Sequence, residues 1–249
     1  MRLISRLDVK NSNLIKTINL EGLRSLGNAT DYALKYYREG IDEIFISDPV
    51  ASLYNREPLY DVLENLTKNI FIPITIGGGI KCISDVVSLL RNGADKVALN
   101  TAVIENPELI SDIANVTGSQ SVVVSIQARR VEHKWLCYTN CGRDNSGKDL
   151  VDWIIEAELR GAGEFIITSV DKEGTFSGVD RNLIQTALNT ASVPITYSGG
   201  FGSLVEFQEL PKIPSLSGLC IAGALHYGKV SICDLRNSMV KNGFDVRLL

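Results

Sequence analysis

The sequence predicts an α/β protein: a single (β/α)8 barrel that spans residues 1–249 and is built from two repeated half-barrels, at about 1–120 and 121–249. Two observations favour this fold class. Eight short apolar runs alternate with longer segments of helical period, which matches such a barrel in count and in length. The chain also repeats itself, with a period too long for a solenoid unit. A doubly wound sheet is the alternative, but a twofold repeat of four units each favours closure.

The repeat is carried by two pairs of matching segments. The stretch IPITIGGGI at 72–80 returns as VPITYSGGF at 193–201, and GIDEIFISD at 40–48 returns as GAGEFIITS at 161–169. The members of each pair are 121 residues apart, from 72 to 193 and from 40 to 161. Each copy is rich in residues that favour strands, and one pair ends in a glycine cluster. We therefore expect equivalent glycine loops in the two halves.

The eight apolar runs are the expected barrel strands. They are Leu3–Val9, Glu43–Ser47, Ile74–Ile76, Lys96–Leu99, Ser121–Gln127, Phe165–Thr168, Ile195–Tyr197 and Leu219–Ile221. Between them, amphipathic segments end at Gly40, Gly93 and Gly161, and glycine is favoured just after a helix C-terminus. The segment 211–218 is the least regular connection, and no linker indicates a second domain.

Composition excludes several classes of protein. The chain is 45% hydrophobic and 22% charged, with a net charge of −4, so we expect no general attraction to nucleic acid or to an anionic membrane. No apolar run approaches the ~18 residues of a membrane span, and the start MRLISRLDVK reads as a strand instead of a signal peptide. Five unpatterned cysteines indicate reduced thiols and a cytoplasmic location. With only His133 and His226, we expect no metal site.

The chemistry of such a barrel is expected where its strands end, because the loops that follow the strands converge there. Glycines and small residues recur at two equivalent places, after strands 3 and 4 and after strands 7 and 8. Exposed backbone N–H groups in such loops bind phosphate, so two of them predict a ligand with a phosphate at each end. The candidate residues at this end are Asp8, Asp48, Gly78, Gly79, Asn100, Thr101, Gln127, Thr168, Glu173, Gly199, Gly200, Ala222 and Gly223.

Seven stretches resemble the cyclase (synthase) subunit of imidazole glycerol phosphate synthase, the HisF family. They run in order along essentially the whole chain: LDVK (7–10), GGGI (77–80), ADKVALNTA (94–102), GSQSVVVSI (118–126), GAGE (161–164), DKEGT (171–175) and SGG (198–200). The resemblance implies a two-phosphate (β/α)8 barrel without a cofactor. It implies a heterodimer with a glutaminase (HisH-like) subunit, whose ammonia crosses the barrel axis. The ammonia would then convert a bisphosphorylated formimino-ribulosyl nucleotide into imidazole glycerol phosphate and an aminoimidazole carboxamide ribotide.

The resemblance also implies a charged gate at the opposite end of the barrel. The four matching residues are Arg2, Glu43, Lys96 and Glu164, each at the start of an expected strand. A buried ring of two cations and two anions is costly to desolvate, so it is not an obvious device for stability. The four charges together favour an ammonia gate over isolated, solvated strand caps.

The catalytic end departs from the family pattern. The family uses two aspartates as general acid and base, and Asp8 matches the first, but Gln127 stands at the second. An amide cannot exchange a proton at neutral pH. Glu173 replaces a third family carboxylate, and Gly223 replaces a serine at the second phosphate site. Lys16 matches the lysine of the loop after strand 1, although the glycines usual around it are missing.

Three functional hypotheses follow from this mixture. The first is a histidine-pathway cyclase that tolerates Gln127. The second is a divergent paralogue that supplies ammonia, together with its glutaminase, for amidination of a sugar in surface-polysaccharide (lipopolysaccharide or O-antigen) synthesis. The third is a non-catalytic scaffold that activates a glutaminase. The phosphate loops and the gate are kept while residues of the catalytic end change, which favours an altered substrate over decay. The sequence leaves the acceptor of the ammonia open.

Overall fold

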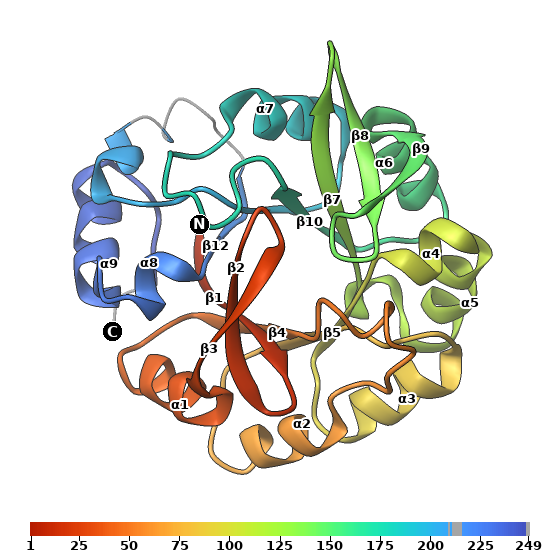
Figure 1. The fold of residues 1–249 in the computed structure, drawn as a ribbon, viewed down its shortest axis with the longest axis horizontal. Coiled ribbons are helices and arrows are strands. Elements are labelled where there is room, and N and C mark those ends of the chain that lie inside the picture. The colour runs from red at the N-terminus through yellow and green to blue at the C-terminus, as the bar shows by residue number, and fades with distance from the viewer. Residues whose placement is uncertain (209, 211–215, 248–249) are drawn as a thin grey trace.

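The computed structural model describes residues 1–208, 210 and 216–247, and it shows a closed barrel of eight parallel strands surrounded by helices (Figure 1). Around the ring the strands are β1 (Arg2–Lys10), β4 (Glu43–Ser47), β5 (Ile74–Gly77), β6 (Lys96–Leu99), β7 (Val122–Val131), β10 (Glu164–Ser169), β11 (Ile195–Ser198) and β12 (Gly218–Ile221). The ring is closed because β12 pairs in parallel with β1, and β10 with β7. The predicted (β/α)8 barrel is confirmed. The division into halves near residue 120 stays a prediction.

Helices cover the outside of the barrel (Figure 1). They are α1 (Ala29–Arg38), α2 (Tyr60–Thr67), α3 (Ile83–Arg91), α4 (Thr101–Glu105), α5 (Glu108–Thr117), α6 (Leu150–Leu159), α7 (Arg181–Thr190), α8 (Gly223–His226) and α9 (Ile232–Lys241), with 3-10 turns at Ser119–Ser121 and Leu204–Gln208. Asn28 caps α1 by accepting hydrogen bonds from two backbone N–H groups of its first turn. In the described part of the chain, no helix has the length and hydropathy to cross a membrane. The connection at 211–218 falls largely outside the described residues.

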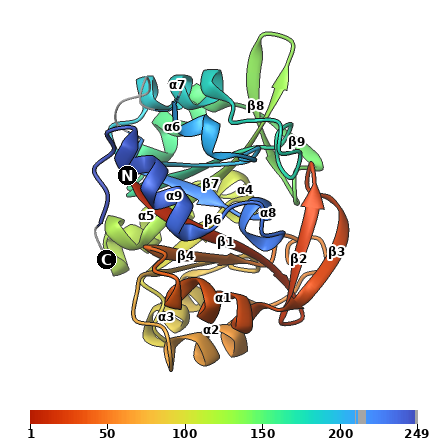
Figure 2. The same cartoon turned by 90° about the vertical axis from the view of Figure 1, so that its left-hand side faces the viewer.

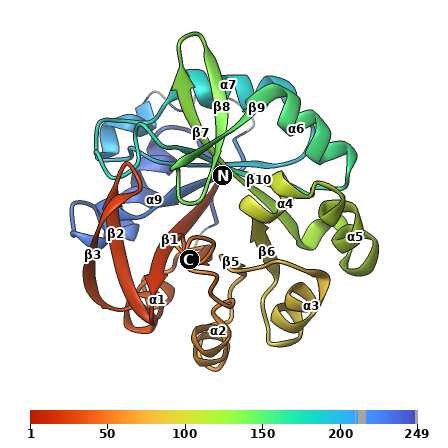
Figure 3. The same cartoon turned by 45° about the vertical axis from the view of Figure 1, so that its right-hand side comes forward.

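Two antiparallel hairpins were not predicted. One is β2 (Asn13–Ile18) with β3 (Glu21–Asn28), and the other extends β7 through β8 (Lys134–Thr139) to β9 (Asp144–Asp149). Figure 2 shows both on the side of the barrel away from the N-terminus, and Figure 3 shows β7 and β8 rising beyond the helices. The fifth strand therefore does not end at Gln127, and Lys16 lies in a strand instead of a loop. Most of β3 is exposed, so it lacks the apolar alternation that marks a strand.

Two apolar layers hold the barrel together. The larger lies between strands and helices and includes Leu3, Leu7 and Ile44. The smaller consists of six buried residues that form their own cluster: Ile4, Phe45, Ala98, Val123, Ile166 and Cys220. Side chains alternate between the two sides of a strand, so in β1 the residues Arg2, Ile4, Arg6 and Asp8 share the side opposite to Leu3 and Leu7. The inner cluster thus separates the polar residues at the two ends of the barrel.

Candidate functional site: two pockets at the barrel mouth

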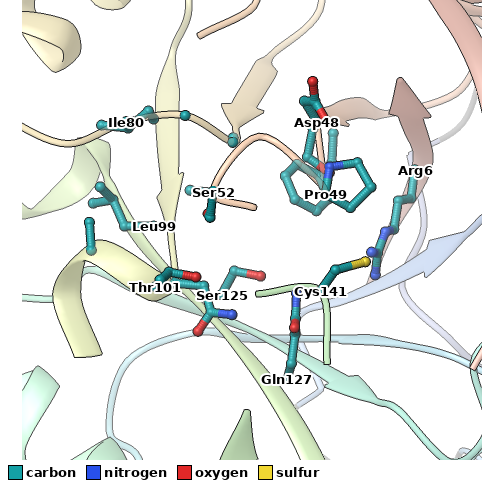
Figure 4. A pocket seen from close by; sticks show the side chains of 18 residues that line it. Arg6, Asp48, Pro49, Ser52, Ile80, Leu99, Thr101, Ser125, Gln127 and Cys141 are labelled. Carbon is teal, nitrogen blue, oxygen red and sulfur yellow. The ribbon is translucent and has the colours of Figure 1, made fainter. Parts of the chain in front are cut away.

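The sequence-predicted residues at the strand ends fall into two pockets. Pocket one is lined mainly by the ends of β4 to β7 (Figure 4), and its predicted members are Asp48, Gly78, Gly79, Asn100, Thr101 and Gln127. Pocket two lies at the ends of β10 to β12, and its predicted members are Lys16, Glu173, Gly199, Gly200, Ala222 and Gly223. Two predicted residues, Asp8 and Thr168, line neither pocket. The two glycine loops therefore belong to separate pockets on one barrel mouth.

Gly78 and Gly199 occupy equivalent places in these pockets. Their φ angles are +91° and +113°, a backbone conformation that residues other than glycine rarely adopt. A Cβ on Gly78 would overlap the carbonyl oxygen of Asp48, and one on Gly199 would lie 2.9 Å from the carbonyl oxygen of Ser169. Asp48 and Ser169 are also related by the 121-residue repeat. The same close backbone approach is thus built at both places.

Pocket two contains a buried ion pair and an aromatic ring. The Nζ of Lys16 pairs with Oε1 of Glu173, and both side chains are almost fully buried. Phe176, which has a φ of +58°, lines the same pocket. A Cβ on Gly223 would lie 3.0 Å from its ring, closer than ordinary van der Waals contact. A serine at position 223, which the family resemblance predicts, would therefore require the ring to shift.

Asp8 is buried between the pockets and is held by Arg6. The Nε of Arg6 donates to Oδ1 of Asp8 at 3.0 Å, and the hydroxyl of Ser47 donates to the same oxygen at 3.2 Å. The second carboxylate oxygen, Oδ2, is buried and has no hydrogen-bond partner in the described part of the chain. Burial alone would raise the pKa of Asp8, but the adjacent Arg6 and Lys16 cations outweigh it and lower the pKa. Asp8 is therefore a carboxylate at neutral pH.

Gln127 and Asp48 are fixed in pocket one by the backbone. The side-chain oxygen of Gln127 accepts from the N–H of Gly142 at 2.6 Å. One oxygen of Asp48 accepts from the N–H of Val50 at 3.1 Å, and the other lies 3.1 Å from Nη1 of Arg56. Burial outweighs Arg56 and raises the pKa of Asp48. Gln127 holds a hydrogen bond but carries no titrating proton.

At the opposite end of the barrel, four charged side chains form a closed ring, the gate ring of Arg2, Glu43, Lys96 and Glu164. Arg2 pairs with both glutamates, and Lys96 Nζ lies 2.6 Å from Glu43 Oε1 and 2.8 Å from Glu164 Oε2. Burial opposes the charged form of Glu164, but Lys96 and Arg2 outweigh it and lower its pKa. These four residues were expected at the strand starts, and the structure brings them together.

Arg6 was not among the site residues predicted from the sequence, but it is buried and lines pocket one (Figure 4). Its signal was present in the alternation of the first strand, because Arg6 shares a side with Arg2 and Asp8. Cys141 of pocket one and Phe176 of pocket two were also missed. They come from the β8–β9 turn and from the loop after β10, where no strand period marks a residue.

The structure defines the class of protein as a (β/α)8 barrel with two equivalent glycine-loop pockets at its mouth. Comparison with known sequences agrees with this class. A family model described as "Histidine biosynthesis protein" matches residues 2–231, so the chain belongs to that family. Within it the chain belongs to the HisF group. It is 51% identical to the imidazole glycerol phosphate synthase subunit HisF of Legionella pneumophila, over 84% of this chain and 99% of that protein. It is 40% identical to the protein of that name in Streptococcus mutans and 38% to that of Pyrococcus furiosus, each over 99% of this chain and 98% of the relative.

Proposed function

We propose that this protein is the cyclase subunit of an imidazole glycerol phosphate synthase. It would use ammonia from a glutaminase subunit to convert a bisphosphorylated formimino-ribulosyl nucleotide into imidazole glycerol phosphate and an aminoimidazole carboxamide ribotide. The observation that carries the proposal is the pair of equivalent glycine loops, at Gly78 and Gly199, in two pockets of one barrel mouth. A ligand that spans both pockets needs a phosphate at each end. The named relatives support the reaction.

Within this reaction, the pocket residues and the buried Asp8 have tasks that their environments allow. The backbone of the two glycine loops would hold the phosphates, because N–H groups in such loops face the ligand. Asp8, an ionised carboxylate with a free Oδ2, would accept protons. Gln127 would orient the substrate by hydrogen bonds and would transfer no proton. Glu173, paired with Lys16, would hold that lysine beside the second phosphate.

The gate ring supports a glutaminase partner at the other end of the barrel. Its charges sum to zero and its four ion pairs close on one another, which suits a seal that does not attract ions. Uncharged ammonia would enter there and cross the inner apolar cluster to the pockets. A HisH-like subunit docked on this face completes the proposal, and a cytoplasmic location, supported by five free cysteines, is part of it.

The test supplies the bisphosphorylated nucleotide with an ammonium salt, and then with glutamine and a HisH-like subunit. We expect imidazole glycerol phosphate in both assays, with glutamine consumed in equal amount to product in the second. Calorimetry with the same nucleotide measures binding apart from turnover. Binding without turnover in either assay would overturn the cyclase proposal and direct the ammonia to another acceptor. A protein that binds no bisphosphate would lose the two-phosphate interpretation as well.

A further inference from the structure

Arg6 is a buried cation at the barrel mouth to which the proposed reaction gives no task. Its side chain starts from β1 and reaches across the barrel, because Nη1 donates to Thr168 Oγ1 of β10 and to Ser198 Oγ of β11, each at 3.1 Å. The Nε of Arg6 donates to Asp8. The guanidinium also lies 5.8 Å from the ring centre of Phe45, on β4. Four strands therefore fix the guanidinium.

This anchoring leaves part of the guanidinium free. Arginine has five N–H donors, and the contacts above engage Nε and Nη1. No residue in the described part of the chain accepts a hydrogen bond from Nη2 of Arg6. Arg6 lines pocket one, whereas its partner Asp8 does not (Figure 4). A ligand in pocket one therefore meets the guanidinium directly.

The other polar groups of pocket one do not satisfy this donor. The Asp48 carboxylate is engaged by Arg56 and by the Val50 backbone. The oxygen of Gln127 is taken by Gly142. Nη2 is not among the buried atoms without a partner, so this donor is open to pocket one. A hydrogen bond from a charged donor is about twice as strong as a neutral one, so a ligand oxygen in the pocket is a favourable acceptor for it.

We infer that Arg6 is a specificity-determining residue of pocket one, where it binds a carboxylate or carbonyl oxygen of a phosphorylated ligand. The phosphate of that ligand would lie at Gly78–Gly79, so the inference rests on the proposed function for the phosphate site alone. Arg6 therefore favours phosphorylated ligands that also carry a carboxylate or carbonyl oxygen within its reach. Asp8 sets the orientation of Arg6 through its hydrogen bond with Nε.

Matched pairs of sugar phosphates test this inference by calorimetry. The two members of a pair each carry one phosphate and have the same chain length, but one ends in a carboxylate and the other in an alcohol. The pairs are 3-phosphoglycerate with glycerol 3-phosphate, 4-phosphoerythronate with erythritol 4-phosphate, and 5-phosphoribonate with ribitol 5-phosphate. In the wild-type protein, the acid of at least one pair should bind roughly tenfold to a hundredfold more tightly than its alcohol, the range expected for a hydrogen bond to a charged group.

The variants separate recognition from a structural role. Arg6→Met with Asp8→Asn removes the ion pair without leaving a buried charge, and it should bind acid and alcohol equally. Asp8→Asn alone keeps Arg6 and should retain the preference. Arg6→Lys keeps the charge without the planar fork and should retain a smaller preference. A structural role for Arg6 would instead weaken acid and alcohol to the same extent.

The outcomes distinguish this inference from the proposed function. Equal binding of acid and alcohol by the wild-type protein at every length would overturn the role of Arg6 and leave the phosphate site intact. A preserved preference in the double variant would also overturn it. Failure of every phosphorylated ligand to bind would overturn both proposals. Circular dichroism melting curves confirm that each variant is folded before its binding is compared.

Discussion

At the scale of the residue, we expect Gln127 to limit proton transfer most directly in the proposed cyclase. It lines pocket one, where its oxygen accepts from Gly142. A positioned acid or base typically contributes ~10²–10⁴ in rate. We expect Gln127→Asp to raise turnover of the bisphosphate with ammonium salt at least about tenfold, within that range. Gln127→Asn has the length of aspartate without its proton and should give no gain. An equal rate in both variants would show that the residue at position 127 does not transfer a proton.

His226 makes stability depend on pH. Its Nδ1 lies 2.8 Å from the hydroxyl of Tyr36 and its Nε2 3.0 Å from the carbonyl oxygen of Arg6. Because a carbonyl can only accept, Nε2 carries the proton and Nδ1 accepts from Tyr36. Burial, and then the Lys16 cation, lower the pKa of His226 to about 4.

As the pH falls, the unfolded chain, with an ordinary histidine pKa of about 6.5, is protonated at a higher pH than the folded protein. Stability is therefore lost as pH falls from about 6.5 to about 4, by about 2 kcal/mol between pH 7 and pH 5. Urea unfolding at the two values measures the loss. His226→Gln should reduce this difference, and His133→Gln, on the exposed β7–β8 turn, should leave it unchanged. An equal loss in the His226 variant would assign the pH dependence to other groups.

At the scale of elements, the glycine loops are predicted to act through close approach of the backbone. A Cβ on Gly79, with a φ of +75°, would lie 2.7 Å from the carbonyl oxygen of Arg56. Gly79→Ala should therefore weaken binding of a bisphosphate, as should Gly200→Ala in pocket two, and calorimetry measures both. Gly147→Ala is the control, because Gly147 has a φ of +76° and nothing within 4 Å of its Cβ position. Unchanged binding in all three variants would reduce the loops to tight turns.

The barrel strands could be predicted because burial on both faces gives each a short and mainly apolar run, bounded by turn residues. The two hairpins could not. They continue from β1 and β7 beyond the barrel, most of β3 is exposed, and β9 (DNSGKD) has no apolar period at all. Their register is set by pairing with β1 and β7, which a local pattern does not contain.

The candidate site could likewise be predicted from the sequence only where its residues directly follow a strand. Gly78 and Gly199 follow strands directly, so the end of an apolar run gives their place in the barrel. Arg6 lies within a run, and its task depends on which residues of β10 and β11 face it across the barrel. That arrangement is a property of closure, and only the folded barrel shows it. The place of Asp8 beside Arg6 was hidden for the same reason.

At the scale of the whole molecule, the gate ring is predicted to couple two active sites. Lys96→Ala leaves Glu43 and Glu164 sharing Arg2, an unbalanced charge at the bottom of the barrel, and removing one partner of a buried pair is costly. With a HisH-like subunit, we expect more glutamine hydrolysed per product formed, while co-purification shows that the complex persists. Lys68→Ala removes an exposed pair with Glu64 and is the matched control. A one-to-one ratio in the Lys96 variant would contradict a gate.

The closing pair of the barrel, β1 with β12, also determines when this protein can fold during synthesis. Arg2 pairs with Gly218, so the first strand to leave the ribosome waits for the last before its second edge is covered. Until then, any sheet that the nascent chain forms has an uncovered edge, and exposed backbone donors and acceptors at an edge are a template for aggregation. The gate ring also cannot form early, because Glu164 is synthesised long after Arg2 and Glu43. We therefore expect the chain to be most prone to aggregation before the segment that contains β12 has been synthesised.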